Sequence, residues 1–205
     1  EAGLAKSTAH RLLASLVSLG YATQDVQTAR YRLTLKMFEL SSGIVSGMDV
    51  ISVAKPHLDR LSRRLGEAVH LVMQYEPLSS YVGRRTPMYC TGVGKAILAT
   101  QSFGEAERVW HKSQIVPITP HTITDFSAFT DQLARARMAG YAVDDEENEP
   151  GIRCVALAIP SMSGRAETAF SISGAASHMT PQRMREVAQA GLATRQDILR
   201  DLGWK

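Results

Sequence analysis

The chain has 205 residues, of which 44% are hydrophobic and 21% are charged. This composition is typical of one or two folded domains and excludes an intrinsically disordered or collagen-like chain. No apolar run approaches the roughly 18 residues that a membrane helix needs, so we expect no membrane partner. Two cysteines, Cys90 and Cys154, are too few for a disulfide framework and predict a cytoplasmic location.

The basic residues are concentrated at the start of the chain. Residues 1–64 contain nine Lys or Arg and five Asp or Glu, a net charge of +4, whereas residues 65–205 contain fourteen and fifteen, a net charge of −1. This distribution predicts a small module that contacts a polyanion, followed by a larger and nearly neutral domain. Chance is the alternative, because a difference of a few charges is common.

The first predicted element is an amphipathic helix that ends at Gly20. Strands are predicted at 21–23 and 31–33, joined by the polar turn 24–28. Because a lone helix cannot bury its apolar face, we expect further residues of this module before Glu1. The apolar positions of the helix, spaced by three and four residues, are Ala9, Leu12, Leu13, Leu16 and Val17.

The rest of the chain mixes strands and helices without regular alternation, which predicts an α+β sandwich around a mixed or antiparallel sheet. Pro56 is expected to kink or restart the helix in which it lies. The strand ending near Tyr75 runs into Pro77 with no turn or partner strand, so we expect missing residues between Glu76 and Pro77. Helices are predicted at 36–46, 50–65, 93–99, 105–111, 126–139 and 181–202, and strands at 68–75, 141–144, 155–160 and 168–173.

Residues 92–95, Gly-Val-Gly-Lys, suggest a phosphate-binding loop, but the pattern fails. A Walker motif requires glycine where Tyr89 stands, and Ser or Thr where Ala96 stands. A dinucleotide-binding fingerprint fails as well, because Ile97 occupies its third glycine position. The remaining reading is a glycine-containing turn that opens a helix, whose free N–H groups favour an anion such as a carboxylate. A tight turn without a ligand is an equally weighted alternative.

The acidic run at 144–149 is unlike an EF-hand calcium loop, because Glu149 stands where that loop requires glycine. Most of these side chains are expected to be solvated, while Asp144 is the candidate to point inward. Cys154 is better explained as a buried structural thiol than as a nucleophile, because no paired histidine motif accompanies it. Zinc held by Cys154, Asp144 and a histidine is a further alternative, but no metal-binding spacing supports it, and no metal or cofactor is predicted.

Ser171 and Ser173 share one face of a predicted strand. If that face is turned inward, two hydroxyls are available to a polar ligand. If it is turned outward, both hydroxyls are solvated. The alternation of side chains along the strand leaves both possibilities open.

Together these stretches resemble the IclR family of transcriptional regulators. The N-terminal stretches are similar to the recognition helix and wing of a winged helix-turn-helix, and residues 84–99 are similar to the family signature. The resemblance covers nearly the whole chain in the right order. Within the family it looks nearest to regulators of sugar-acid catabolism, such as ketodeoxygluconate repressors. The matching stretches are 3–13, 19–21, 31–33, 84–99, 144–147, 151–154 and 171–174.

The resemblance implies an α+β chain with three parts. These are the C-terminal part of a winged helix DNA-binding domain at 1–35, a linker helix at 36–49 and a GAF-like α/β effector-binding domain at 50–205. It also implies a homodimer or homotetramer on double-stranded operator DNA, controlled by a small carboxylate effector such as a keto or sugar acid. Two helices that precede the recognition helix in the family, and a strand-containing stretch before Pro77, have no counterpart here.

The site residues follow by position from the same resemblance. The DNA contacts would come from the exposed start of the recognition helix and from the wing, namely Lys6, Ser7, Thr8, His10, Arg11, Arg30 and Arg32. The effector would be bound by backbone N–H groups, hydroxyls, a carboxylate and an apolar wall. The effector-binding residues would be Leu78, Gly92, Val93, Asp144, Cys154, Ser171 and Ser173.

The leading hypothesis is therefore a ligand-responsive transcriptional regulator and not an enzyme. An enzyme that processes a small carboxylate with Cys154 and Asp144 is the first alternative, although no paired acid and base motif supports it. A sensor domain without DNA contact is the second alternative. Salt-dependent affinity for DNA would distinguish the regulator from the sensor.

Overall fold

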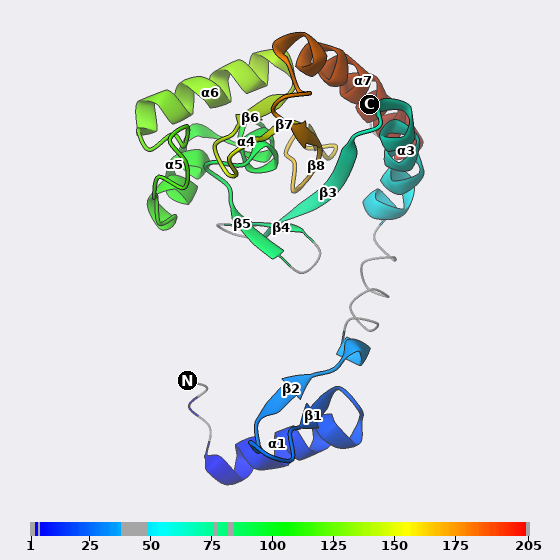
Figure 1. Ribbon diagram of the computed structural model, residues 1–205. Coiled ribbons are helices and arrows are strands. Elements are labelled where there is room, and N and C mark those ends of the chain that lie inside the picture. Colours follow the sequence, from blue (N-terminus) through cyan, green and yellow to red (C-terminus); the bar gives the residue numbers. More distant parts are fainter. Residues whose placement is uncertain (1–2, 4, 38–48, 76–77, 82–83, 204–205) are drawn as a thin grey trace. The chain divides into compact units, whose positions relative to one another are not determined.

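The computed structural model describes residues 3, 5–37, 49–75, 78–81 and 84–203 (Figure 1). The chain forms two compact units, Glu1–Ser52 and Val53–Lys205. The predicted linker helix at 36–49 falls almost entirely outside the described residues.

The first unit contains one helix and a hairpin. Helix α1 (Lys6–Ser18) is followed by β1 (Ala22–Gln24) and β2 (Tyr31–Leu33), which pair antiparallel. The hairpin turn is held by Asp25, whose Oδ1 accepts the backbone N–H of Thr28 at 2.8 Å. The helix end is secured because Lys36 Nζ donates to the carbonyl of Leu19 at 2.9 Å. The predicted helix and hairpin are thus both present.

The second unit is built on an antiparallel sheet. Among the described residues, its strands follow the order β5-β4-β3-β8-β7-β6. Strands β3 and β8, which lie far apart in the sequence, pair in the middle of the sheet. The strands are β3 (Ala68–Tyr75), β4 (Leu78–Tyr81), β5 (Arg84–Pro87), β6 (Ala142–Asp145), β7 (Ile152–Ile159) and β8 (Thr168–Ala175).

Helices cover both faces of this sheet, as Figure 1 shows. Helix α3 (Asp49–Leu65) and helix α7 (Pro181–Asp201) lie side by side on one face, where His57 Nε2 is 2.8 Å from Asp201 Oδ2. The opposite face carries α4 (Gly92–Leu98), α5 (Phe103–Lys112) and α6 (Phe126–Ala139). The expected α+β class is confirmed. Helix α3 passes through Pro56 as one continuous element.

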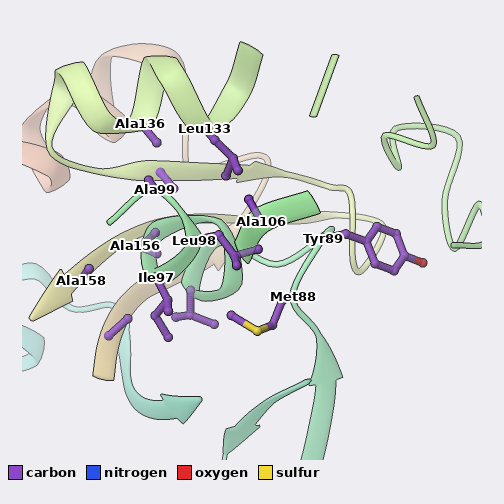
Figure 2. Packing of buried hydrophobic residues seen from close by; sticks show 14 of the residues in the cluster. Met88, Tyr89, Ile97, Leu98, Ala99, Ala106, Leu133, Ala136, Ala156 and Ala158 are labelled. Carbon is purple, nitrogen blue, oxygen red and sulfur yellow. The ribbon is translucent and has the colours of Figure 1, made fainter. Parts of the chain in front are cut away.

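A buried apolar cluster joins α4, α5 and α6 to the sheet (Figure 2). Figure 2 shows Ile97 and Leu98 of α4 packed near Met88 and below α6. Helix α4 lies unusually close to the preceding segment, because a Cβ on Gly94 would be 2.3 Å from the Met88 carbonyl oxygen. No side chain fits there, so glycine at position 94 is what allows α4 to pack against the segment at Met88.

The sequence analysis predicted no strand directly after β3, whereas the structure has β4 and β5 there. Strand β4 begins at Leu78 and pairs antiparallel with β3, with Tyr75 opposite Leu78, and β5 pairs with β4 in turn. Both strands were missed because their sequences are polar or end in proline, as at Pro87, and so lack the apolar alternation of a half-buried strand. Residues 76–77, where missing residues were expected, lie outside the described part of the chain.

Candidate functional site

A row of polar side chains crosses three neighbouring strands of the second unit. Asp144 of β6 is opposite Cys154 of β7, and Cys154 is opposite Ser173 of β8. One step along the sheet, Ser171 is opposite Ala156 on one side and His70 on the other. Because side chains directly opposite each other share a face, the strand register gathers these residues on one surface.

Helix α4 covers this surface with its first turn. Thr91 caps the helix, since its Oγ1 accepts the backbone N–H of Gly94 at 3.2 Å. A Cβ on Gly92 would be 3.2 Å from Ala156 Cβ, so the start of the helix lies directly against β7. The first N–H of the helix to donate to an intrahelical carbonyl is that of Lys95, to Thr91, so the N–H groups of Gly92 and Val93 have no intrahelical acceptor and are available to a ligand.

Helix and strands enclose a cavity of about 590 Å³, which we call the effector cavity after the residues predicted to bind an effector. The predicted residues that line it are Gly92, Val93, Asp144, Cys154, Ser171 and Ser173. Leu78, the seventh predicted residue, lies in β4, where only the backbone is described. The sequence reasoning missed other wall residues. These are Ala68, His70, Thr86, Thr91, Asn148, Glu149, Ile152 and Gly174.

Asp144 is an acidic group that is almost completely buried. Its side chain is 5% exposed, whereas neighbouring Asp145 is exposed. Its Oδ1 accepts the backbone N–H of Glu147 at 2.8 Å and that of Asn148 at 3.4 Å. Burial nevertheless dominates and raises the pKa of the Asp144 carboxyl from 3.8 to about 6, although the charge of Lys95 opposes the change.

Ser171 is the cavity residue with the least satisfied polar atom. It is 2% exposed, and its Oγ has no hydrogen-bond partner among the described residues. A buried hydroxyl without a partner is costly and uncommon. A ligand in the effector cavity is able to supply the missing partner.

The predicted DNA-contacting residues are all accessible. Lys6, Ser7, Thr8, His10 and Arg11 are exposed on α1, and Arg30 and Arg32 are exposed at the hairpin. Helix α1 has no acidic residue in its first turn, so its N-terminal end is free of negative side chains. This end of the unit therefore presents positive charge and hydroxyls together.

Two family models match the chain. The model described as "Bacterial transcriptional regulator IclR C-terminal" matches residues 75–200, and the model "IclR helix-turn-helix domain" matches residues 1–26. The chain belongs to the IclR family. It is therefore a member of a family of DNA-binding transcriptional regulators.

IclR-family relatives are named as regulators and repressors, not as enzymes. The DNA-binding transcriptional repressor YiaJ of Escherichia coli is 35% identical over 99% of this chain and 78% of its own length. The regulator KdgR of the same organism is 32% identical over 89% of this chain and 75% of its own length. These names agree with the prediction that the chain is a regulator.

Solved IclR structures share the fold of this chain. The IclR protein of Thermotoga maritima matches with a TM-score of 0.81 and 29% identity over 98% of this chain and 87% of that one. An IclR homolog from Microbacterium hydrocarbonoxydans, solved in complex with 4-hydroxybenzoate, matches with a TM-score of 0.77 and 23% identity. That match covers 95% of this chain and 86% of that one, and at this identity it shows a common fold.

Behind the cavity of this IclR domain lies a buried ion pair that the sequence patterns did not reveal. Lys95 Nζ of α4 donates to Glu147 Oε1 and, at 2.7 Å, to Gln132 Oε1 of α6. Lys95 is 1% exposed and Glu147 is 2% exposed, so each buried charge is stabilised by its partner instead of by water. Glu147 was counted among the solvated residues of the acidic run, and its burial corrects that expectation. Only the loop geometry after β6 turns it inward.

The cysteines of this IclR domain are poorly suited to nucleophilic chemistry. Burial, aided by the negative charge of Asp144, raises the pKa of the Cys154 thiol to about 12. Burial raises the pKa of the Cys90 thiol to about 12 as well. A nucleophilic cysteine requires the opposite change. In the described part of the chain, no group of three His, Cys, Asp or Glu residues is arranged to hold a metal ion.

None of the helices in the described ranges is both long and apolar enough to cross a membrane. The sequence analysis expected no membrane partner because the sequence has no long apolar run.

Proposed function

We propose that this chain is a cytoplasmic, ligand-responsive regulator, acting as a homodimer or homotetramer. Residues 1–35 bind double-stranded operator DNA, and the domain at 50–205 binds a small carboxylate in the effector cavity. The observation that carries the ligand proposal is the buried Ser171 hydroxyl, which lines this cavity and has no hydrogen-bond partner among the described residues.

The chemistry of the wall favours an acid that also carries a keto or hydroxyl group. The N–H groups of Gly92 and Val93 suit the carboxylate, because they are free donors at a helix start. Asp144, when ionised, accepts a hydrogen bond from a ligand hydroxyl, whereas Ser171 and Ser173 donate or accept. A keto or sugar acid uses all of these groups. The solved homolog with 4-hydroxybenzoate also contains a hydroxylated carboxylate.

Calorimetric titration of small 2-keto and sugar acids into the chain tests the effector proposal. We expect at least one acid to bind, and Ser171→Ala to weaken it by about 1–3 kcal/mol, since the ligand loses a buried partner. Ser177→Ala, an exposed serine after β8, is the matched control and should leave binding unchanged. Equal binding by Ser171→Ala and the unaltered chain would remove this hydroxyl from the ligand site.

For DNA, we propose that Lys6 and Arg11 contact phosphate or guanine, that Ser7, Thr8 and His10 contact the backbone or bases, and that Arg30 and Arg32 reach a neighbouring phosphate or the minor groove. The test uses a double-stranded fragment selected from a random pool, with affinity measured at several salt concentrations. Arg11→Ala should cost about 1–3 kcal/mol if Arg11 reads a base. Arg185→Ala, an exposed arginine on α7, is the control.

A further inference from the structure

A second cavity, of about 410 Å³, lies in the same unit as the effector cavity. The two cavities lie at opposite ends of α4. Gly92 and Val93 line the effector cavity, whereas Ala96 and Ala99 line the second cavity. The first also contains the acidic side chains Asp144 and Glu149. The second has no acidic residue in its described wall but contains Arg137 of α6 and Arg195 of α7. We call it the arginine cavity.

Arg195 brings an incompletely satisfied positive charge into the arginine cavity. One of its terminal nitrogens, Nη1, donates to the Gly140 carbonyl at 2.8 Å. Its Nε is buried and has no hydrogen-bond partner among the described residues, and within them the side chain forms no ion pair. Burial also lowers the pKa of this guanidinium. An unpaired buried donor on a charged group requires an explanation, and a bound anion supplies one.

Arg137 offsets the negative charge that would otherwise repel an anion in the arginine cavity. The last carbonyls of a helix carry partial negative charge, and α4 ends beside the arginine cavity. Arg137 donates from Nε to the Ala99 carbonyl and from Nη2 to the Gln101 carbonyl, both at 2.8 Å. Its positive charge therefore offsets the end of α4 while its Nη1 is not used in either bond.

We propose that the arginine cavity binds a small organic oxyanion, a compact carboxylate or phosphate compound, independently of the effector cavity. With Nη1 engaged by Gly140, the Nε and Nη2 edge of Arg195 remains, and this edge matches two oxygens of a carboxylate or phosphate. Thr100 and Tyr141 add hydroxyls to the wall, and the alanines of α4 and β7 leave room for a short carbon chain.

Thermal denaturation of the whole chain tests this proposal, with malonate and inorganic phosphate as probes and sodium chloride at equal ionic strength as the reference. Malonate, phosphate or both should raise Tm above the chloride value, because a ligand of the native state stabilises it. Arg195→Gln should weaken the response about tenfold or more in concentration, because the charged fork is lost. Arg200→Gln, on the same helix but paired with Asp197 at the surface, should retain it.

The location is tested separately from the proposed effector. Ser171→Ala alters only the effector cavity and should leave the response to phosphate unchanged, while any malonate bound in the effector cavity is weakened. Loss of the phosphate response in Ser171→Ala, or an unchanged response to both probes in Arg195→Gln, would overturn the proposal. Should Arg195→Gln fail to fold, the Nε–H resonance of Arg195 in the unaltered chain gives the answer. Malonate or phosphate must shift it, and a constant resonance contradicts binding there.

Discussion

Replacing Asp144 by Asn should stabilise the protein while weakening the proposed effector site. The native carboxyl has a pKa of about 6, against 3.8 for the ordinary group. Because the native state holds this proton to higher pH than the unfolded chain does, stability falls as pH rises from about 4 to about 6. At about 1.36 kcal/mol per pH unit, the full cost is about 3 kcal/mol. Asn avoids that cost, and its oxygen can still accept the N–H of Glu147.

Urea unfolding followed by circular dichroism measures this effect. Asp144→Asn should be more stable than the unaltered chain by about 3 kcal/mol near pH 7.5, and by about half of that near pH 5. Asp145→Asn is the control, because Asp145 is exposed and pairs with Arg153 at 2.5 Å, so its effect should stay below about 1 kcal/mol. No gain in Asp144→Asn, or a gain that is the same at both pH values, would refute the reasoning.

Three further predictions concern packing and reactivity. Lys95→Met should lower the free energy of unfolding by about 3–5 kcal/mol, because Glu147 is left buried without its partner, and adding Glu147→Gln should restore most of the loss in the same urea assay. Gly94→Ala should lower Tm markedly, whereas Gly104→Ala in α5, with no atom within 4 Å of the added Cβ, should change it little or raise it. The Cys154 thiol should resist iodoacetamide near pH 8 until the chain is unfolded in urea, and rapid labelling of the native protein would contradict its raised pKa.

The helices could be predicted because their signals are local. Thr180 before Pro181 marks the start of α7, and Gly140 with φ of 78° marks the end of α6. Strands β4 and β5 escaped prediction because their positions depend on the pairing of β4 with β3 and of β5 with β4, not on an apolar pattern of their own.

The candidate site could be predicted only in part, because some of its features depend on local sequence and others on tertiary structure. Residue type and alternation single out Ser171 and Ser173, but not which face they occupy. The register that puts Asp144 opposite Cys154 is a tertiary property, and so is the ion pair between Lys95 and Glu147, which lie 52 positions apart. A threonine before a glycine-containing helix start was a local signal left unused, since it predicts Thr91 as the cap.

Because the polar row crosses β6, β7 and β8, a ligand in the effector cavity would also stabilise the edge of the sheet. Strand β6 spans four residues, is the outermost strand of the described sheet, and follows α6 after only Gly140 and Tyr141. Strands in such positions fray first, which amide hydrogen exchange detects as weak protection. A ligand that holds Asp144 and Ser173 together straddles β7 and must be released before β6 can peel away. Ligand binding would then slow the fraying of β6. It would also restrict the motion of α6, because only Gly140 and Tyr141 connect the two elements.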